Sequence, residues 1–309
     1  MIGSQSFEKF RDLDALFVDK SLFIEDFINS PSQVDLILRP RRFSKSLNLS
    51  MLKSFFRIGT DPDLFRGLVI FERKIGAEES SSSNENVKTF MEEYCGKYPV
   101  LHLNLMHVHG STWMEILREL WSAVQKMAEE HRSVIDLKYP GEDPFHFNKF
   151  FSDPPSEDFV KSSFSNLMQT LCEYHKKKVI VLIDEYDTPF NKTHREVFYA
   201  QTMEFLGEFL SSALNGNDAL FKACIVGVGE VKMDWMSQCK HMTVHSYLND
   251  KYSPYFGITV EEVRQLGVDE EALKHVMKWY GGYYFGDYQA KSVQYFGLER
   301  QAQHICQNS

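Results

Sequence analysis

Short apolar runs alternate with longer amphipathic segments along most of this 309-residue chain, and this alternation constrains the fold more than any other feature. Runs of about five apolar residues bounded by turn residues are typical of buried strands. Strands that alternate with helices predict an α/β fold, with a parallel sheet covered by helices on both faces. The expected strands are residues 34–38, 98–105, 179–183, 221–226 and 243–248.

The segments between these runs repeat their apolar residues at helical spacing. Helices are therefore expected at residues 46–56, 113–131, 157–174 and 195–214. The pattern becomes purely helical over residues 259–280, which indicates a small C-terminal helical subdomain. We expect a phosphate-loop NTPase-like α/β domain over residues 1–255, the helical subdomain over 256–286 and a poorly packed tail over 287–309. The serine-rich stretch 78–86 is expected to be a surface loop.

Composition excludes several classes of protein. Lys and Arg number 34 against 43 Asp and Glu, a formal net charge of −9, so nucleic acid is not an expected partner and any anion site must be local. No apolar run approaches the roughly 20 residues of a bilayer span. Residues 1–20 lack a signal-peptide pattern, so we expect a cytoplasmic protein without a membrane partner. Five scattered cysteines without a C-x-x-C pair favour reduced thiols.

One basic segment lies between the first expected strand and the helix after it. It reads Arg39-Pro40-Arg41-Arg42-Phe43-Ser44-Lys45-Ser46. A phosphate loop needs backbone N–H groups at a helix N-terminus, a lysine for the terminal phosphates and a hydroxyl for Mg²⁺, and Lys45 and Ser46 fit the last two roles. The pattern G-x-x-x-x-G-K-[ST] has glycine at the positions of Arg39 and Ser44. Taken alone, the segment matches that pattern only weakly and favours the alternative of a basic turn that begins an amphipathic helix.

Two carboxylates, Asp184 and Glu185, follow the apolar run 179–183. The carboxyl ends of parallel strands form the ligand-binding edge of an open α/β sheet. In a phosphate-loop enzyme an Asp at this place orders Mg²⁺ and a following Glu polarises the attacking water. The alternative is a solvated acidic turn before Pro189. Together the two motifs favour a site with Glu185 as the catalytic residue, Ser46 and Asp184 as metal ligands, and Arg41, Arg42, Phe43, Ser44, Lys45 and Ser46 as nucleotide-binding residues.

The order of these motifs resembles that of the AAA-ATPase-like family, a divergent group of phosphate-loop proteins. The resemblance is carried by residues 17–21, 39–47, 98–100, 182–187, 252–262 and 279–283. It implies ATP and Mg²⁺ as cofactors, ATP hydrolysis as the activity and a protein partner of unknown identity. Bacterial members of the family often carry a C-terminal nuclease-like domain. The resemblance fades after residue 287, so we do not expect that domain here.

Two departures from the family pattern bear on hydrolysis. Ser44 stands where the family has a glycine, which supplies positive φ freely, and Val226 stands where the family usually has a threonine before Gly227. A second interpretation is therefore a non-hydrolysing interaction module that keeps the fold. The E-x-K triplet formed by Glu230 and Lys232 leaves a metal-dependent nuclease as a third, weaker one.

Other charged residues are candidates to approach the nucleotide. Arg39, Arg41 and Arg42 either add positive charge around the phosphates or form salt bridges with the acidic residues that follow the strand 179–183. Asp19 or Lys20 is expected to approach from the N-terminal side.

Overall fold

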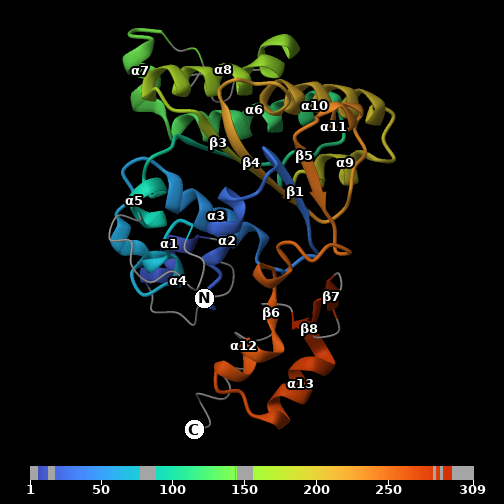
Figure 1. Cartoon of the computed structure of the whole chain (residues 1–309). Coiled ribbons are helices and arrows are strands. Elements are labelled where there is room, and N and C mark those ends of the chain that lie inside the picture. Colours follow the sequence, from blue (N-terminus) through green and yellow to red (C-terminus); the bar gives the residue numbers. More distant parts are fainter. Residues whose placement is uncertain are drawn as a thin grey trace.

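Five parallel strands form the centre of the molecule in the order β2-β3-β4-β1-β5 (Figure 1). The structure is a computed structural model that describes residues 6–12, 18–76, 88–142, 144, 156–280, 283–285 and 288–293. The expected serine-rich loop and most of the expected tail lie outside these residues. The predicted α/β fold with a parallel sheet is confirmed. Its strands are β1 (Val34–Leu38), β2 (Val100–Asn104), β3 (Val179–Asp184), β4 (Leu220–Gly227) and β5 (Met242–His245).

The strand order decides which loops meet. β4 lies between β1 and β3, so the ends of β1 and β3 are two strand spacings, about 10 Å, apart. β5 is on the other side of β1, and β2 is the opposite edge strand. Because all five strands are parallel, their carboxyl ends share one edge, and loops that follow different strands gather there.

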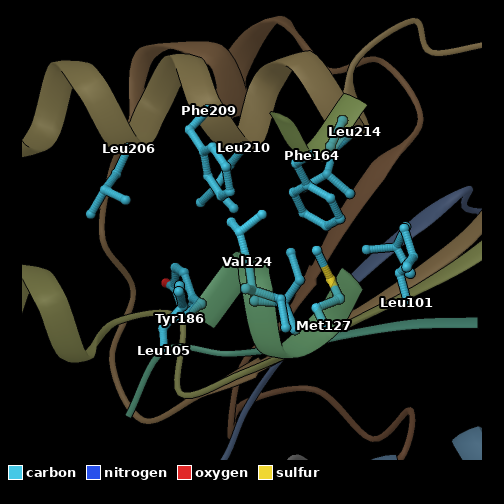
Figure 2. Close-up of a cluster of buried hydrophobic side chains, with 14 of the residues drawn as sticks. Leu101, Leu105, Val124, Met127, Phe164, Tyr186, Leu206, Phe209, Leu210 and Leu214 are labelled. Atoms are coloured by element: carbon cyan, nitrogen blue, oxygen red, sulfur yellow. The ribbon is translucent and has the colours of Figure 1, made fainter. Parts of the chain in front are cut away.

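Helices cover both faces of the sheet, as predicted. One face is covered by α6 (Trp113–Glu129), α8 (Glu157–His175) and α10 (Tyr199–Leu214), at the top of Figure 1. In Figure 2, Phe164 of α8 and Phe209 of α10 lie over Val124 of α6, in the larger of the hydrophobic clusters. The other face carries α3 (Lys45–Phe56), with α1 (Phe7–Asp12), α2 (Leu22–Ile28), α4 (Val69–Glu72) and α5 (Phe90–Tyr94) around it.

Successive side chains of a strand point to opposite faces of the sheet, which explains how both faces of the sheet are buried under helices. Val181 and Ile183 face the α6, α8 and α10 layer, whereas Ile180 and Leu182 pack in the cluster beneath α3. All six residues of β3 are buried. Such a strand needs apolar residues at successive positions, which is the pattern that identified it in the sequence.

Several short elements complete the main domain and refine the expected boundaries. They are η1 (Pro62–Phe65), α7 (Arg132–Lys138), α9 (Thr188–Thr193), α11 (Asp234–Gln238) and η3 (Ser253–Tyr255). The helix expected from residue 195 begins at Tyr199, because a separate helix, α9, begins at Thr188 and ends at Thr193. The strand expected over 243–248 ends at His245, where the chain turns.

The C-terminal region contains the expected helices α12 (Val260–Gln265) and α13 (Glu270–Tyr280). It also contains β6 (Ile258–Thr259), β7 (Tyr283–Phe285) and β8 (Tyr288–Val293), which form an antiparallel sheet in the order β6-β8-β7. The sequence analysis missed these strands. Of the helices in the described residues, none combines the length and the apolar character needed to cross a membrane.

Candidate functional site

The basic segment 39–44 forms the loop between β1 and α3. Ser44 is the N-cap of α3 and has the left-handed backbone conformation, with φ 59° and ψ 19°. Arg42 also has positive φ, at 69°. This geometry turns the chain sharply into the helix, so the first N–H groups of α3 lie at the sheet edge, where a helix N-terminus favours anions.

Lys45, the first residue of α3, folds back over this loop. Its side chain is buried, and its Nζ donates to the carbonyl of Pro40 at 3.0 Å. Burial lowers the pKa of the Lys45 amine, while the negative charges of Glu185, Asp184 and Asp187 oppose that shift. The lysine therefore lies within electrostatic reach of all three carboxylates. The structure brings together the two motifs that the sequence analysis paired.

The Asp184 carboxylate ends β3 at the same edge and is completely buried. Its Oδ2 accepts a long hydrogen bond, 3.4 Å, from Nδ2 of Asn104, and its Oδ1 has no hydrogen-bond partner. Burial raises the pKa of Asp184 to about 6, and interaction with the Ser46 side chain lowers it by less. The alternative of a solvated acidic turn is wrong, because Asp184 and Asp187 are both buried.

Glu185 follows directly and is half-buried. Its backbone also has positive φ, at 53°, which is uncommon for a residue with a Cβ. Its Oε2 accepts a hydrogen bond of 3.4 Å from the hydroxyl of Thr188. A left-handed residue at this point turns the chain away from the line of β3.

The remaining predicted nucleotide residues lie in different surroundings. The Phe43 side chain is buried in the core beneath α3, so it is not placed to contact a phosphate. Arg41 and Arg42 are exposed, and the charge of Arg41 contributes to lowering the pKa of Lys45. The Ser44 hydroxyl is buried and has no hydrogen-bond partner.

Arg39 occupies the first glycine position of the phosphate-loop pattern, but its buried guanidinium holds the end of β5. Its Nη1 donates to the carbonyls of Leu38, His245 and Ser246 at 2.8, 3.2 and 2.9 Å, and its Nη2 donates to the carbonyl of Lys251 at 3.2 Å. These contacts fasten the chain after β5 to the start of the phosphate loop. The side chain has a structural role that the sequence did not indicate.

Asp19 and Lys20 also have structural contacts. The Asp19 carboxylate accepts from the backbone N–H groups of Ser21 and Val69. Lys20 is buried, and its Nζ donates to Glu262 of α12 at 2.5 Å and to the carbonyl of Pro254 at 2.7 Å. These two residues join the N-terminal segment to the neighbouring elements.

The sequence analysis missed a second layer of polar residues behind the site. Asp187 is buried and accepts from the backbone N–H groups of Val228 and Gly229, at 3.2 and 3.0 Å. The hydroxyl of Tyr186 donates to the carbonyl of Gly229 at 2.8 Å and accepts from the N–H of Val231 at 2.9 Å. The loop after β4 is thus tied to the acidic motif of β3.

Gly227 shows how closely these two loops approach. A Cβ at this position would lie 2.5 Å from the Tyr186 ring and 2.6 Å from Oδ1 of Asp187, so no other residue fits without movement. Val226, just before it, is buried in the core beneath α3. Glu230 and Lys232, the E-x-K pair, are exposed in the loop that follows.

Asn104 is a further residue that the sequence analysis did not select. It ends β2 in register with Asp184, and its Oδ1 accepts from the N–H of Met106 at 2.9 Å, which fixes the direction of its amide. A polar residue that ends an apolar strand was the available signal. The alternating composition of this edge strand made that signal weak.

The residues at this edge fit a magnesium–nucleotide complex. The buried, unpaired Oδ1 of Asp184 and the Ser46 hydroxyl are oxygen donors, the kind that Mg²⁺ takes from proteins while phosphates and water supply its other ligands. Across the described ranges, no group of three or more His, Cys, Asp or Glu residues is arranged to hold a metal ion.

Comparison with known proteins gives two findings. The family described as "Predicted AAA-ATPase" matches residues 1–237, which include the phosphate loop, the acidic motif and the loop after β4. The chain is also similar to a protein of Azotobacter chroococcum mcd 1 described as "Uncharacterized protein in vnfD 5'region", with 24% identity over 293 residues. That match covers 91% of this chain but 48% of the relative, so the chain spans about half the length of that protein.

Proposed function

Because this chain belongs to the AAA-ATPase-like family, we propose that it binds ATP with Mg²⁺ and hydrolyses it where β1 and β3 end. One observation carries the proposal. The buried lysine Lys45 interacts electrostatically with the buried carboxylate of Asp184, and one oxygen of that carboxylate has no hydrogen-bond partner. A buried, unpaired charge is costly unless a ligand compensates for it. A triphosphate with its metal ion would compensate for both residues at once.

Lys45 is assigned to the β- and γ-phosphates. Its contact with the Pro40 carbonyl keeps the amine over the loop, and phosphate oxygens would replace that carbonyl as the acceptor. The backbone N–H groups of residues 43–46 would donate to the same phosphates. Arg41 and Arg42, which are exposed beside the loop, would add positive charge.

Ser46 and Asp184 are assigned to the metal ion, and Glu185 to the attacking water. When bound, Mg²⁺ neutralises charge that develops on the phosphates. Asn104 holds the Asp184 carboxylate from β2, so that Oδ1 is the oxygen left for the ion. Glu185 lies one residue beyond Asp184, and its carboxylate would take up a proton from water as the γ-phosphate bond breaks.

A second candidate function is that of a nucleotide-binding interaction module without turnover. Two observations favour it. Ser44 has a buried hydroxyl at the N-terminus of α3, where the phosphates would bind. On β4, Val226 has no polar group that could contact these phosphates.

The experiment that separates the two functions measures ATP binding and phosphate release with and without Mg²⁺. The protein is compared with Lys45→Ala and Glu185→Gln. The ATPase proposal expects Lys45→Ala to lose binding, and Glu185→Gln to keep binding but lose turnover by a factor of at least about 100. Tight Mg²⁺-dependent binding without any turnover would favour the interaction module, and absence of binding would refute both functions.

A further inference from the structure

Two large apolar side chains are exposed on the turn that follows β5. Tyr247 is 58% exposed and Leu248 is 72% exposed. The turn is nevertheless well ordered by its own hydrogen bonds, because Ser246 donates from its N–H and its hydroxyl to Oδ1 of Asn249, at 2.8 and 3.1 Å. Adjacent exposed apolar side chains on an ordered turn form a small surface that a ligand can cover.

Arg39 fixes this turn beside the phosphate loop. Its guanidinium donates to the carbonyls of His245 and Ser246, the two residues that immediately precede Tyr247. It also lies over the ring of Phe256, 5.6 Å from the ring centroid, and is almost completely buried. The exposed pair is therefore anchored to the first residue of the phosphate loop.

The strand order indicates how a bound nucleotide would be oriented along the carboxyl edge of the sheet. Under the proposed function, the γ-phosphate lies toward Glu185 on β3, and the phosphates wrap the N-terminus of α3 after β1. β5 is on the side of β1 opposite to β3. The nucleoside, which lies beyond the α-phosphate, would thus extend over the end of β5, where Tyr247 and Leu248 are exposed.

We infer that Tyr247 and Leu248 form the nucleobase subsite of this protein, with the tyrosine ring stacked on a purine. This inference rests on the proposed function. Stacking on an aromatic ring needs only the π-face of a base, so the subsite binds adenine and guanine alike unless other residues read their edges. Leu248 supplies an apolar contact to the same base.

The test compares ATP with inorganic tripolyphosphate, which has the phosphates and no base. Stacking on one aromatic ring contributes enough that Tyr247→Ala should bind MgATP about 5- to 100-fold more weakly. Tripolyphosphate, measured as a competitor for the same site, should bind the variant and the unchanged protein equally. Tyr247→Phe keeps the ring and should bind MgATP normally. Tyr174→Ala, which removes another exposed tyrosine from the end of α8, is the matched control.

Each result has a defined meaning. If Tyr247→Ala binds MgATP as tightly as the unchanged protein, the subsite is refuted and the proposed function stands. If the variant loses MgATP and tripolyphosphate equally, the substitution disturbs the phosphate loop and base stacking is refuted. If the unchanged protein binds neither compound, the proposed function fails and the subsite fails with it.

Discussion

Replacing Ser44 by glycine should stabilise this protein, which is opposite to the usual effect of introducing glycine. The left-handed backbone at Ser44, with φ 59°, costs a residue with a Cβ about 1–2 kcal/mol. Its buried hydroxyl has no hydrogen-bond partner, which costs about 1–3 kcal/mol more. Glycine loses about 0.5–1 kcal/mol through the greater freedom of the unfolded chain. The expected net gain in the free energy of unfolding is about 2 kcal/mol.

Urea unfolding measures this gain as a higher midpoint with an unchanged slope. Ser162→Gly is the control, because Ser162 is exposed within α8 and its hydroxyl bonds to carbonyls of its own helix. That variant should lose about 0.5 kcal/mol through helix propensity. Ser44→Gly should also bind MgATP more tightly, since no side chain would stand at the helix N-terminus. If Ser44→Gly is no more stable than the unchanged protein, the reasoning on backbone strain is wrong.

Three other substitutions test the polar residues of the site. Burial raises the pKa of Asp184 to about 6, whereas a carboxyl in the unfolded chain titrates near pH 4. Between these two pH values the folded protein binds one more proton than the unfolded chain, so folding is favoured at the lower pH. In EDTA, the free energy of unfolding should therefore fall by about 2–3 kcal/mol between pH 4 and 7. Asp184→Asn should remove most of that fall, and an unchanged pH profile of urea unfolding would contradict the assignment. Gly227→Ala should lower the free energy of unfolding by more than about 2 kcal/mol, because its Cβ would clash with Tyr186. Gly207→Ala on α10 is the control and should cause no loss, because its Cβ has room. Equal shifts of the melting temperature in the two variants would exclude the close approach at Gly227. Tyr186→Phe should cost about 1–3 kcal/mol by leaving two backbone groups of the loop after β4 unpaired, and faster amide exchange in that loop would reveal it.

The main elements of the fold could be predicted because each has a local signal. The continuous apolar character of β3 and the helical spacing in α3 are properties of neighbouring residues. The strand order has no such signal, since it depends on which distant segments pair. The strands β7 and β8 were missed because β7 has only three residues and β8 mixes polar with apolar residues, so neither forms a recognisable apolar run.

The candidate site could be predicted in outline for a different reason. Lys45 follows the loop after β1, and Asp184 ends β3. Because the carboxyl ends of parallel strands share one edge of the sheet, the proximity of these two residues follows from the fold class. The roles of Arg39, Asp187 and Asn104 depend on hydrogen bonds to residues far along the chain. No spacing in the sequence reveals such contacts.

The most direct test of the central claim is to replace Mg²⁺ by Mn²⁺ and record the electron–nuclear couplings of the metal in the presence of ATP. The account places one metal ion between Ser46, Asp184 and the phosphates that Lys45 binds. It therefore predicts couplings between Mn²⁺ and the phosphorus nuclei of ATP in a complex bound to the protein. Asp184→Asn should lose this signal, and a control substitution on the far side of the sheet should keep it. The same couplings in Asp184→Asn, or no protein-bound Mn²⁺–ATP complex at all, would contradict the account.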